Sequence, residues 1–225
     1  MLLQFLQQRG SMSPLDLLFL MLGYAVILFL CLPVHEFAHG LMAHWCGDDT
    51  AKWYGRLTLN PFKHLDVLGT IMILTVGMGY AKPVPVNSRN FRNYKRDMIL
   101  VALAGPISNF LMALVAMVLY RLLPLFVGNH MAPYLLIGLL LSIVIDVNIS
   151  LMVFNLLPVP PLDGSRLWSS LLPARWSYAL EQYSRYIAMG LMMLIFIGAL
   201  DLPLYWLRFG AYKVLELLTA WTVLF

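Results

Sequence analysis

Four long apolar segments constrain the fold of this chain more than any other feature of its sequence. They cover about residues 15–45, 98–121, 134–157 and 186–206, and each approaches or exceeds the ~20 residues that a helix needs to cross a bilayer. Overall, 61% of the residues are hydrophobic and only 12% are charged. Because backbone polar groups in lipid must be satisfied internally, each segment is predicted to be helical. The expected fold class is an all-α polytopic membrane protein with about four to six transmembrane helices.

Two further apolar stretches do not resemble ordinary spans. Residues 66–80 are short and rich in glycine, so we expect a re-entrant segment that returns to the side from which it entered. Residues 207–225 carry Arg208, Lys213 and Glu216, which leaves a short span and an interfacial helix both open. No secretory signal is recognised. We predict one integral membrane domain over residues 1–225, with a core at about 15–170 and C-terminal helices at about 186–225.

Basic residues are distributed unevenly between the connecting regions. Residues 46–97 contain eight Lys or Arg residues and residues 158–185 contain three, whereas residues 122–133 contain none. The positive-inside rule therefore predicts that both basic regions are cytoplasmic and that the N-terminus lies outside. The net charge of +4 comes from basic residues that flank the apolar segments, where they set membrane orientation. The sequence has none of the motifs of nucleic-acid binding, so no nucleic-acid partner is expected.

A short motif in the first apolar segment indicates the chemistry. His35 and His39 are four residues apart and Glu36 lies between them, which is the HExxH zinc signature. On a helix these two positions share one face, so both imidazoles can bind one metal while Glu36 projects toward a water molecule. A pair of packed core histidines is the alternative, but ionisable residues inside membrane helices are costly and by default indicate a functional site.

A catalytic zinc ion requires a third protein ligand, and Asp163 is the best candidate. Three prolines precede it in the sequence Leu-Leu-Pro-Val-Pro-Pro-Leu, which ends the third long helix and leaves an irregular segment at membrane depth. Such backbone is tolerated there only where protein buries it or where it lines a watery cavity. If residues 66–80 do not cross the membrane, Asp163 emerges on the side of the histidines. A turn-forming Asp-Gly pair is the alternative role.

Several other polar residues are candidates for the same site. Asn155 is predicted to hydrogen-bond a peptide carbonyl or oxyanion beside the metal, and Asn109 could do the same or bridge two helices. Asp146 is an intramembrane carboxylate for which a functional polar contact is one alternative. Solvated or capping roles are expected for the remaining histidines, which are His44, His64 and His130.

Residues 81–87 are predicted to be extended. Their sequence is Ala-Lys-Pro-Val-Pro-Val-Asn, in which each proline disfavours helix in the residue before it and valine favours strands. We expect a short β-like element near the site, and a polyproline-like surface linker is the alternative.

Three motifs in this order give the chain a family resemblance. They are HEFAH at 35–39, AGPISN at 104–109 and NLLPVPPLDG at 155–164. With them the chain resembles the site-2 protease family of intramembrane zinc metalloproteases, peptidase family M50, over most of residues 20–170. The resemblance implies one zinc ion bound by His35, His39 and Asp163, with Glu36 as the base. Without a recognisable PDZ or CBS domain, the chain is similar to a compact prokaryotic form, with the active site toward the cytoplasmic side of the cell membrane.

The predicted function is hydrolysis of peptide bonds in or near transmembrane segments of other membrane proteins, as in regulated intramembrane proteolysis. The expected partners are a transmembrane protein substrate and the lipid bilayer, and the sequence gives no oligomeric state. A zinc-binding membrane adaptor or carrier without proteolytic activity is the alternative. Glu36 separates the two, because a carrier needs metal ligands but no base at that position.

Overall fold

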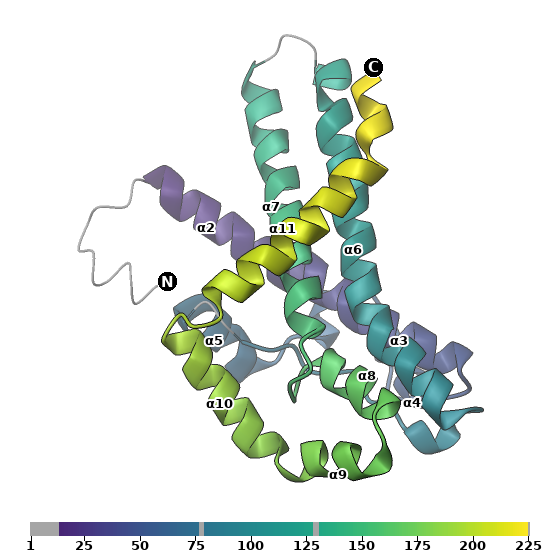
Figure 1. The fold of residues 1–225 in the computed structure, drawn as a ribbon. Coiled ribbons are helices and arrows are strands. Elements are labelled where there is room, and N and C mark those ends of the chain that lie inside the picture. The colour runs from purple at the N-terminus through teal and green to yellow at the C-terminus, as the bar shows by residue number, and fades with distance from the viewer. Residues whose placement is uncertain (1–13, 77–78, 128–130, 225) are drawn as a thin grey trace.

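The computed structural model describes residues 14–76, 79–127 and 131–224, and it is helical throughout its long segments (Figure 1). The first apolar segment forms one helical run of α2 (Pro14–Val26), a π-helical turn η1 (Ile27–Cys31) and α3 (Leu32–Trp45). π-Helical turns inside α-helices are frequent at functional sites, and this one directly precedes the HExxH motif. The sequence-based boundaries of about 15–45 are confirmed.

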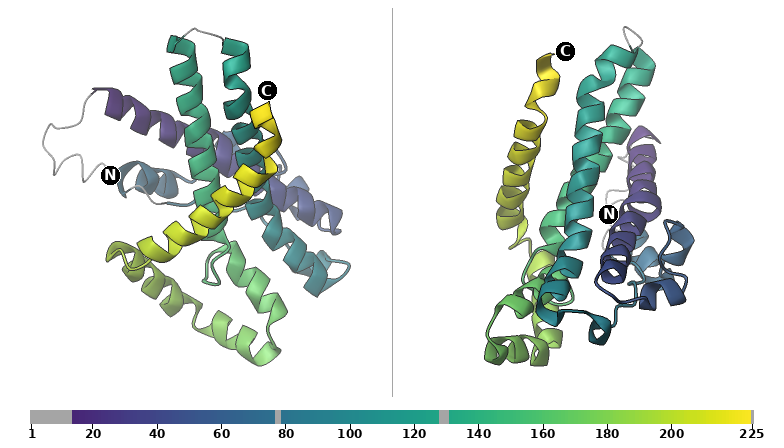
Figure 2. Two further views of the ribbon diagram at one scale, coloured as in Figure 1. Left: turned by 45° about the horizontal axis from the view of Figure 1, so that its top comes forward. Right: turned by 90° about the vertical axis from the view of Figure 1, so that its right-hand side faces the viewer.

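The second and third apolar segments form a long antiparallel hairpin of α6 (Tyr94–Val127) and α7 (Met131–Asn155). Small residues, Ala113 and Ala116, face Ile145, Ile149 and Val153 across their contact, and all five are buried. Small side chains let membrane helices approach closely, so packing rather than hydrophobic transfer holds this pair together. The hairpin lies between the first helical run on one side and the C-terminal helix α11 on the other (Figure 2).

The C-terminal region departs from the predicted helix over residues 186–206. After α8 (Asp163–Leu171) and α9 (Ala174–Gln182), the chain forms α10 (Ser184–Phe196) and α11 (Asp201–Leu218), whose axes differ by 89°. Gly198 has a φ of +73° at the turn between them, a conformation that glycine adopts without strain. One continuous helix over 186–206 is therefore wrong. Among the described residues, three helices are long and apolar enough to span a membrane, or four if the bent pair counts as one.

The described part of residues 66–80 contains no helix long enough to span a membrane, as the prediction of a re-entrant segment requires. Helix α5 (Val67–Val76) has ten residues, about half of what a full crossing needs. A Cβ atom on Gly69 would overlap the carbonyl group of Tyr80, and one on Gly79 would overlap the carbonyl oxygen of Gly69. The chain therefore returns directly alongside α5, and only glycine permits this backbone approach.

The segment after the return, residues 81–87, runs past α3 without helix or strand assignment, and the described residues contain no strand elsewhere. The expected β-like element is therefore not formed, because this segment pairs with no strand in the described part of the chain. Arg56 donates to the carbonyl oxygens of Lys82 at 2.6 Å and Pro83 at 3.2 Å. Asp48, which is fully buried, accepts the N–H of Asn87 at 2.7 Å. The short helices of this region are α4 (Thr50–Trp53), η2 (Pro61–Lys63) and η3 (Ser88–Asn90), and η4 (Ala220–Leu224) follows α11.

Candidate metal centre

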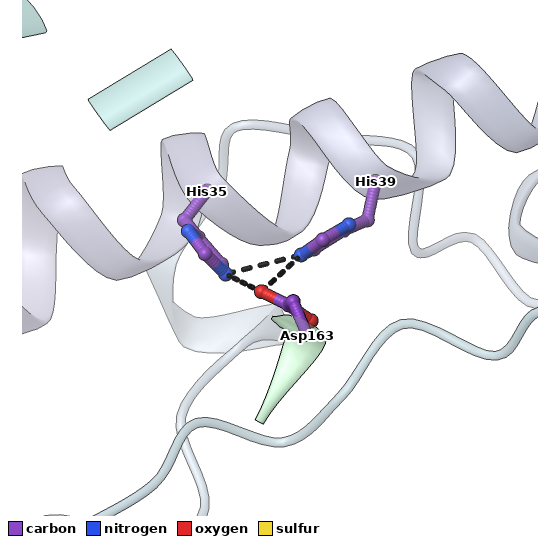
Figure 3. Close-up of side chains that lie close together, drawn as sticks. All are labelled: His35, His39 and Asp163. Atoms are coloured by element: carbon purple, nitrogen blue, oxygen red, sulfur yellow. Dashed lines mark hydrogen bonds and ion pairs between the residues drawn. The ribbon is translucent and has the colours of Figure 1, made fainter. Parts of the chain in front are cut away.

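Two histidines and one carboxylate converge on a single point inside the helical bundle (Figure 3). His35 and His39 project from the same face of α3, and their Nε2 atoms are 3.0 Å apart. Each Nε2 atom is 3.1 Å from Oδ2 of Asp163, which is the first residue of α8. The two histidines are only 5% and 8% exposed. The structure therefore brings together three potential ligand atoms that are far apart in sequence, since 124 residues separate His39 from Asp163.

The hydrogen bond behind His39 indicates which of its two ring nitrogens faces the cluster without a proton when the ring is neutral. Nδ1 of His39 lies 2.7 Å from the carbonyl oxygen of Val101, which can only accept, so Nδ1 carries the proton. In the neutral ring, Nε2 then presents a lone pair toward Oδ2 of Asp163, which is also an acceptor. Two acceptors at this distance repel each other unless a proton or a metal ion lies between them. A buried carboxylate between two such rings is the donor set that zinc prefers.

The spacing of the three atoms also fits zinc. Tetrahedral zinc with bonds of ~2.0–2.1 Å would hold its ligand atoms ~3.3 Å apart. The separations here are 3.0 and 3.1 Å, so an adjustment of a few tenths of an ångström suffices. With three protein ligands, one coordination position remains for water, which is the arrangement of catalytic rather than structural zinc sites.

Asp163 reaches the histidines because of the proline-rich segment before it. Helix α7 ends at Asn155, and short turns such as Leu162 N–H to Val159 O at 3.0 Å lead into α8. This connection lies at the same end of the α6–α7 hairpin as α3 (Figure 1). Burial disfavours the charged form of Asp163, but the interactions with the His35 and His39 rings outweigh burial and hold the pKa of this carboxyl well below its usual range. The carboxylate form, which binds metals, is therefore favoured.

The wall facing the histidines comes from α6, at the start of the AGPISN sequence. A Cβ atom on Gly105 would overlap the rings of both His35 and His39. Only a glycine lets the α6 backbone approach the cluster this closely. Pro106 follows and lacks the N–H that would bond to Ala102, which loosens the helix at this turn. No role was assigned to Gly105 from the sequence, although a Gly-Pro pair inside an apolar helix is unusual and could have indicated a close helix contact.

Asn109, which also lies on α6, contacts His35 on α3. Its amide nitrogen is 3.2 Å from Nδ1 of His35, and the Asn109 side chain is fully buried. Its Oδ1 atom is buried without a hydrogen-bond partner among the described residues. The sequence suggested that Asn109 contacts substrate or bridges helices, and the structure makes it a bridge from α6 to a histidine of the cluster.

Glu36 lies beside the cluster without joining the three converging atoms. Its Oε2 atom accepts the N–H of Val84 at 2.8 Å, which ties the extended segment 81–87 to α3. The Val84 side chain is buried, and one of its methyl groups would contact a Cβ placed on Gly40. Among the described residues Glu36 has no other hydrogen-bond partner, so its second oxygen is free to accept a proton.

The other candidates lie outside the cluster. The Asn155 amide donates to the carbonyl oxygen of Leu151, in its own helix, at 3.0 Å. His44 pairs with Asp49, and Nε2 of His64 donates to the carbonyl oxygen of Thr58 at 2.7 Å. Asp146 forms an ion pair with Arg208 of α11. His130 lies outside the described residues.

Comparisons with known proteins agree with this chemistry. The model of the family described as peptidase family M50 matches residues 23–133 and 125–199. A Bacillus subtilis protein provisionally named zinc metalloprotease YwhC is 40% identical over 205 residues, which cover 89% of this chain and 93% of that protein. Proteins provisionally named zinc metalloprotease Rip2 are 30% identical over 143 residues in Mycolicibacterium smegmatis and 32% over 152 residues in Mycobacterium tuberculosis. These alignments cover 52% and 55% of the Rip2 proteins. No solved structure matches the chain.

Proposed function

The chain belongs to peptidase family M50 and is a zinc metalloprotease of the membrane, and from this premise we propose that it cleaves peptide bonds within or beside transmembrane segments of other membrane proteins. One observation carries the proposal: two of the three converging ligand residues, His35 and His39, belong to a helical run that is long and apolar enough to span a bilayer. His35 is ten residues before the end of α3 at Trp45, so it lies ~15 Å along the axis from that end.

In this proposal His35, His39 and Asp163 hold the zinc ion and Glu36 is the general base. Bound zinc supplies Lewis acidity that activates water at neutral pH and polarises a peptide carbonyl. Glu36 takes the proton from the attacking water and returns it to the leaving amine. The Val84 N–H holds one carboxylate oxygen at 2.8 Å and thereby directs the other. Asn155, at the end of α7, is proposed to bind the substrate backbone close to Asp163.

Water and substrate need a route to a centre buried at this depth. A polar cavity of about 390 Å³ lies beside Asp163, and its lining includes Val86, Pro160, Ser165 and Arg166. Ser165 is two residues from Asp163, and Val86 is two residues from the partner of Glu36. The cavity is thus lined by sequence neighbours of the candidate site, although no candidate ligand lines it. We propose that water enters through it.

A helical substrate must unwind before its carbonyl can be attacked, because an intact helix encloses that group. Segment 81–87 offers an open edge for the unwound strand. Among the described residues, the carbonyl groups of Val84 and Val86 accept no hydrogen bond. Pairing of substrate along this edge would use main-chain hydrogen bonds. A Val86→Pro variant that removes one N–H and cleaves substrate with an unchanged KM would exclude edge pairing.

We also propose the surroundings of this activity. The chain acts as one integral membrane domain in the cytoplasmic membrane of a prokaryotic cell, with the metal centre toward the cytoplasm. The eight basic residues of 46–97, which follow the end of α3, support that orientation. A zinc-binding adaptor or carrier remains the second candidate function, and it would use the same ligands without Glu36.

The test compares wild type with Glu36→Gln and Asp163→Ala in liposomes that contain model transmembrane substrates. Removing the base should lower kcat by about 100-fold or more while bound zinc stays at the wild-type level. Removing the candidate ligand should lower both bound zinc and cleavage. Equal behaviour of Glu36→Gln and wild type, with zinc bound but no substrate cleaved, would instead establish the adaptor or carrier.

A further inference from the structure

We propose that Asn109 is a positioning residue that selects the metal-binding tautomer of His35. The inference rests on the proposed zinc site and concerns the hydrogen-bond partner of His35 on the side of the ring away from the metal. His35 can bind a metal through Nε2 only if its other nitrogen, Nδ1, carries the ring proton and donates it to an acceptor. The described residues offer Nδ1 of His35 one hydrogen-bond partner, and that partner is the side-chain amide of Asn109.

The two histidines of the cluster are supported differently. His39 donates to the carbonyl oxygen of Val101 at 2.7 Å, and a backbone carbonyl can only accept, so its tautomer is fixed. The partner of His35 is an amide, which can present either a donor or an acceptor. In the structure its Nδ2 atom lies 3.2 Å from Nδ1 of His35, and this orientation pairs with the tautomer that carries the proton on Nε2. That proton then bonds to Oδ2 of Asp163 at 3.1 Å.

The unpartnered oxygen of Asn109 supplies the second conformation. Oδ1 is buried and accepts no hydrogen bond among the described residues, although a buried amide oxygen without a partner is costly. A 180° turn about the Cβ–Cγ bond would exchange the two amide atoms. Oδ1 would then accept from Nδ1–H of His35, and the Nε2 lone pair would face the metal. The amide can therefore pair with either tautomer of His35, which a backbone carbonyl could not.

A second buried asparagine provides a matched control. Asn148 of α7 is fully buried like Asn109, and its Oδ1 is also without a partner among the described residues. It contacts the same helical run one turn earlier, where its amide nitrogen is 3.2 Å from Sγ of Cys31. Asn148 therefore matches Asn109 in burial, residue type and packing partner but touches neither histidine. A general packing role would make the two residues equivalent.

The experiment measures zinc affinity by chelator competition and the visible spectrum of the Co²⁺-substituted protein, both in detergent and without substrate. Asn109→Leu should weaken zinc binding by about 10–100-fold and change the Co²⁺ bands, as removal of such outer partners does elsewhere. Asn109→Asp keeps an acceptor and should retain wild-type affinity and spectrum. Asn148→Leu should bind zinc like wild type.

Three results would overturn the inference. They are wild-type affinity in Asn109→Leu, an equal loss in Asn148→Leu, and a loss in Asn109→Asp. Should Asn109→Leu fail to fold, the Asn109→Asp variant decides between the two amide atoms, because an acceptor role predicts its full affinity and a donor role predicts a loss. A wild-type protein that binds no zinc would reject the proposed site itself, whereas wild-type binding that is insensitive to Asn109 would reject only this inference.

Discussion

Two polar clusters lie among the helices of this protein, and they differ in burial and in the balance of hydrogen-bond donors and acceptors. The metal cluster consists of His35, His39 and Asp163, which come from α3 and α8. The Asp146 cluster consists of Asp146 on α7 with Arg208 and Tyr212 on α11. The first is buried, whereas the side chains of Asp146 and Arg208 are 56% and 38% exposed.

The decisive difference is the balance of donors and acceptors. In the Asp146 cluster one carboxylate oxygen accepts from both Arg208 and the hydroxyl of Tyr212, the latter at 3.1 Å. Its opposite charges are paired within the cluster, although Nε of Arg208 is buried without a hydrogen-bond partner among the described residues. In the metal cluster, acceptor atoms of His39 and Asp163 face each other at 3.1 Å, so the cluster is completed only by a cation. Intramembrane charge thus identifies both clusters, but only the unmatched acceptors indicate a ligand site.

Gly105→Ala should break the metal cluster most severely. The added methyl group would overlap both imidazole rings, so α3 and α6 must separate. Displacing the ligands by ~1 Å is enough to reduce proteolysis by about 100-fold, and zinc binding should fall with it. Zinc content and cleavage of a transmembrane substrate measure the effect. Gly138→Ala on α7 is the control, because its methyl group would meet neighbours at an ordinary 3.6 Å. A Gly105→Ala protein with normal zinc content would contradict the close approach of α6.

Asp146→Leu should destabilise the protein without affecting zinc. It leaves Arg208 without its counter-charge at membrane depth, which costs about 1–3 kcal/mol. The double variant Asp146→Leu with Arg208→Leu removes both charges and should recover part of that loss. Unfolding in detergent gives the stabilities, and chelator competition gives the zinc affinity of each variant. If zinc affinity fell in step with the loss of this pair, the two clusters would be coupled and their separation would be wrong.

The convergence of His35, His39 and Asp163 could be predicted because the motifs that carry these residues are local in the sequence. HExxH places two rings on one helical face within five residues, and the prolines before Asp163 force an irregular segment to the same side. The partners behind the rings are not local. The Val101 carbonyl and Asn109 are 62 and 74 residues from the histidines they contact, and a backbone carbonyl leaves no mark in a sequence. No periodicity or spacing rule reaches across helices in this way.

The C-terminal error has a related cause. Residues 186–206 are apolar enough to be predicted as one span. Hydropathy measures composition and contains no information about a change in the direction of the helix axis. The turn depends on Gly198 at φ +73° and on the contact of Leu215 with the α6–α7 core. Asp146 was similarly recognised as an intramembrane carboxylate, but its partner lies 62 residues away on the helix that the turn redirects. The sequence therefore identified the charge without identifying what balances it.

Tyr212→Phe should have the smallest effect and gives the finest test of the comparison. It removes one donor to Asp146, a bond of 3.1 Å, while the Arg208 pair remains. Interhelical hydrogen bonds in membranes contribute on average about 0.6 kcal/mol, so unfolding in detergent should show a loss of that order. Zinc affinity should stay at the wild-type value. A destabilisation as large as that of Asp146→Leu would mean that the hydroxyl, and not the ion pair, holds α11 against α7, and the matched-charge description of this cluster would fail.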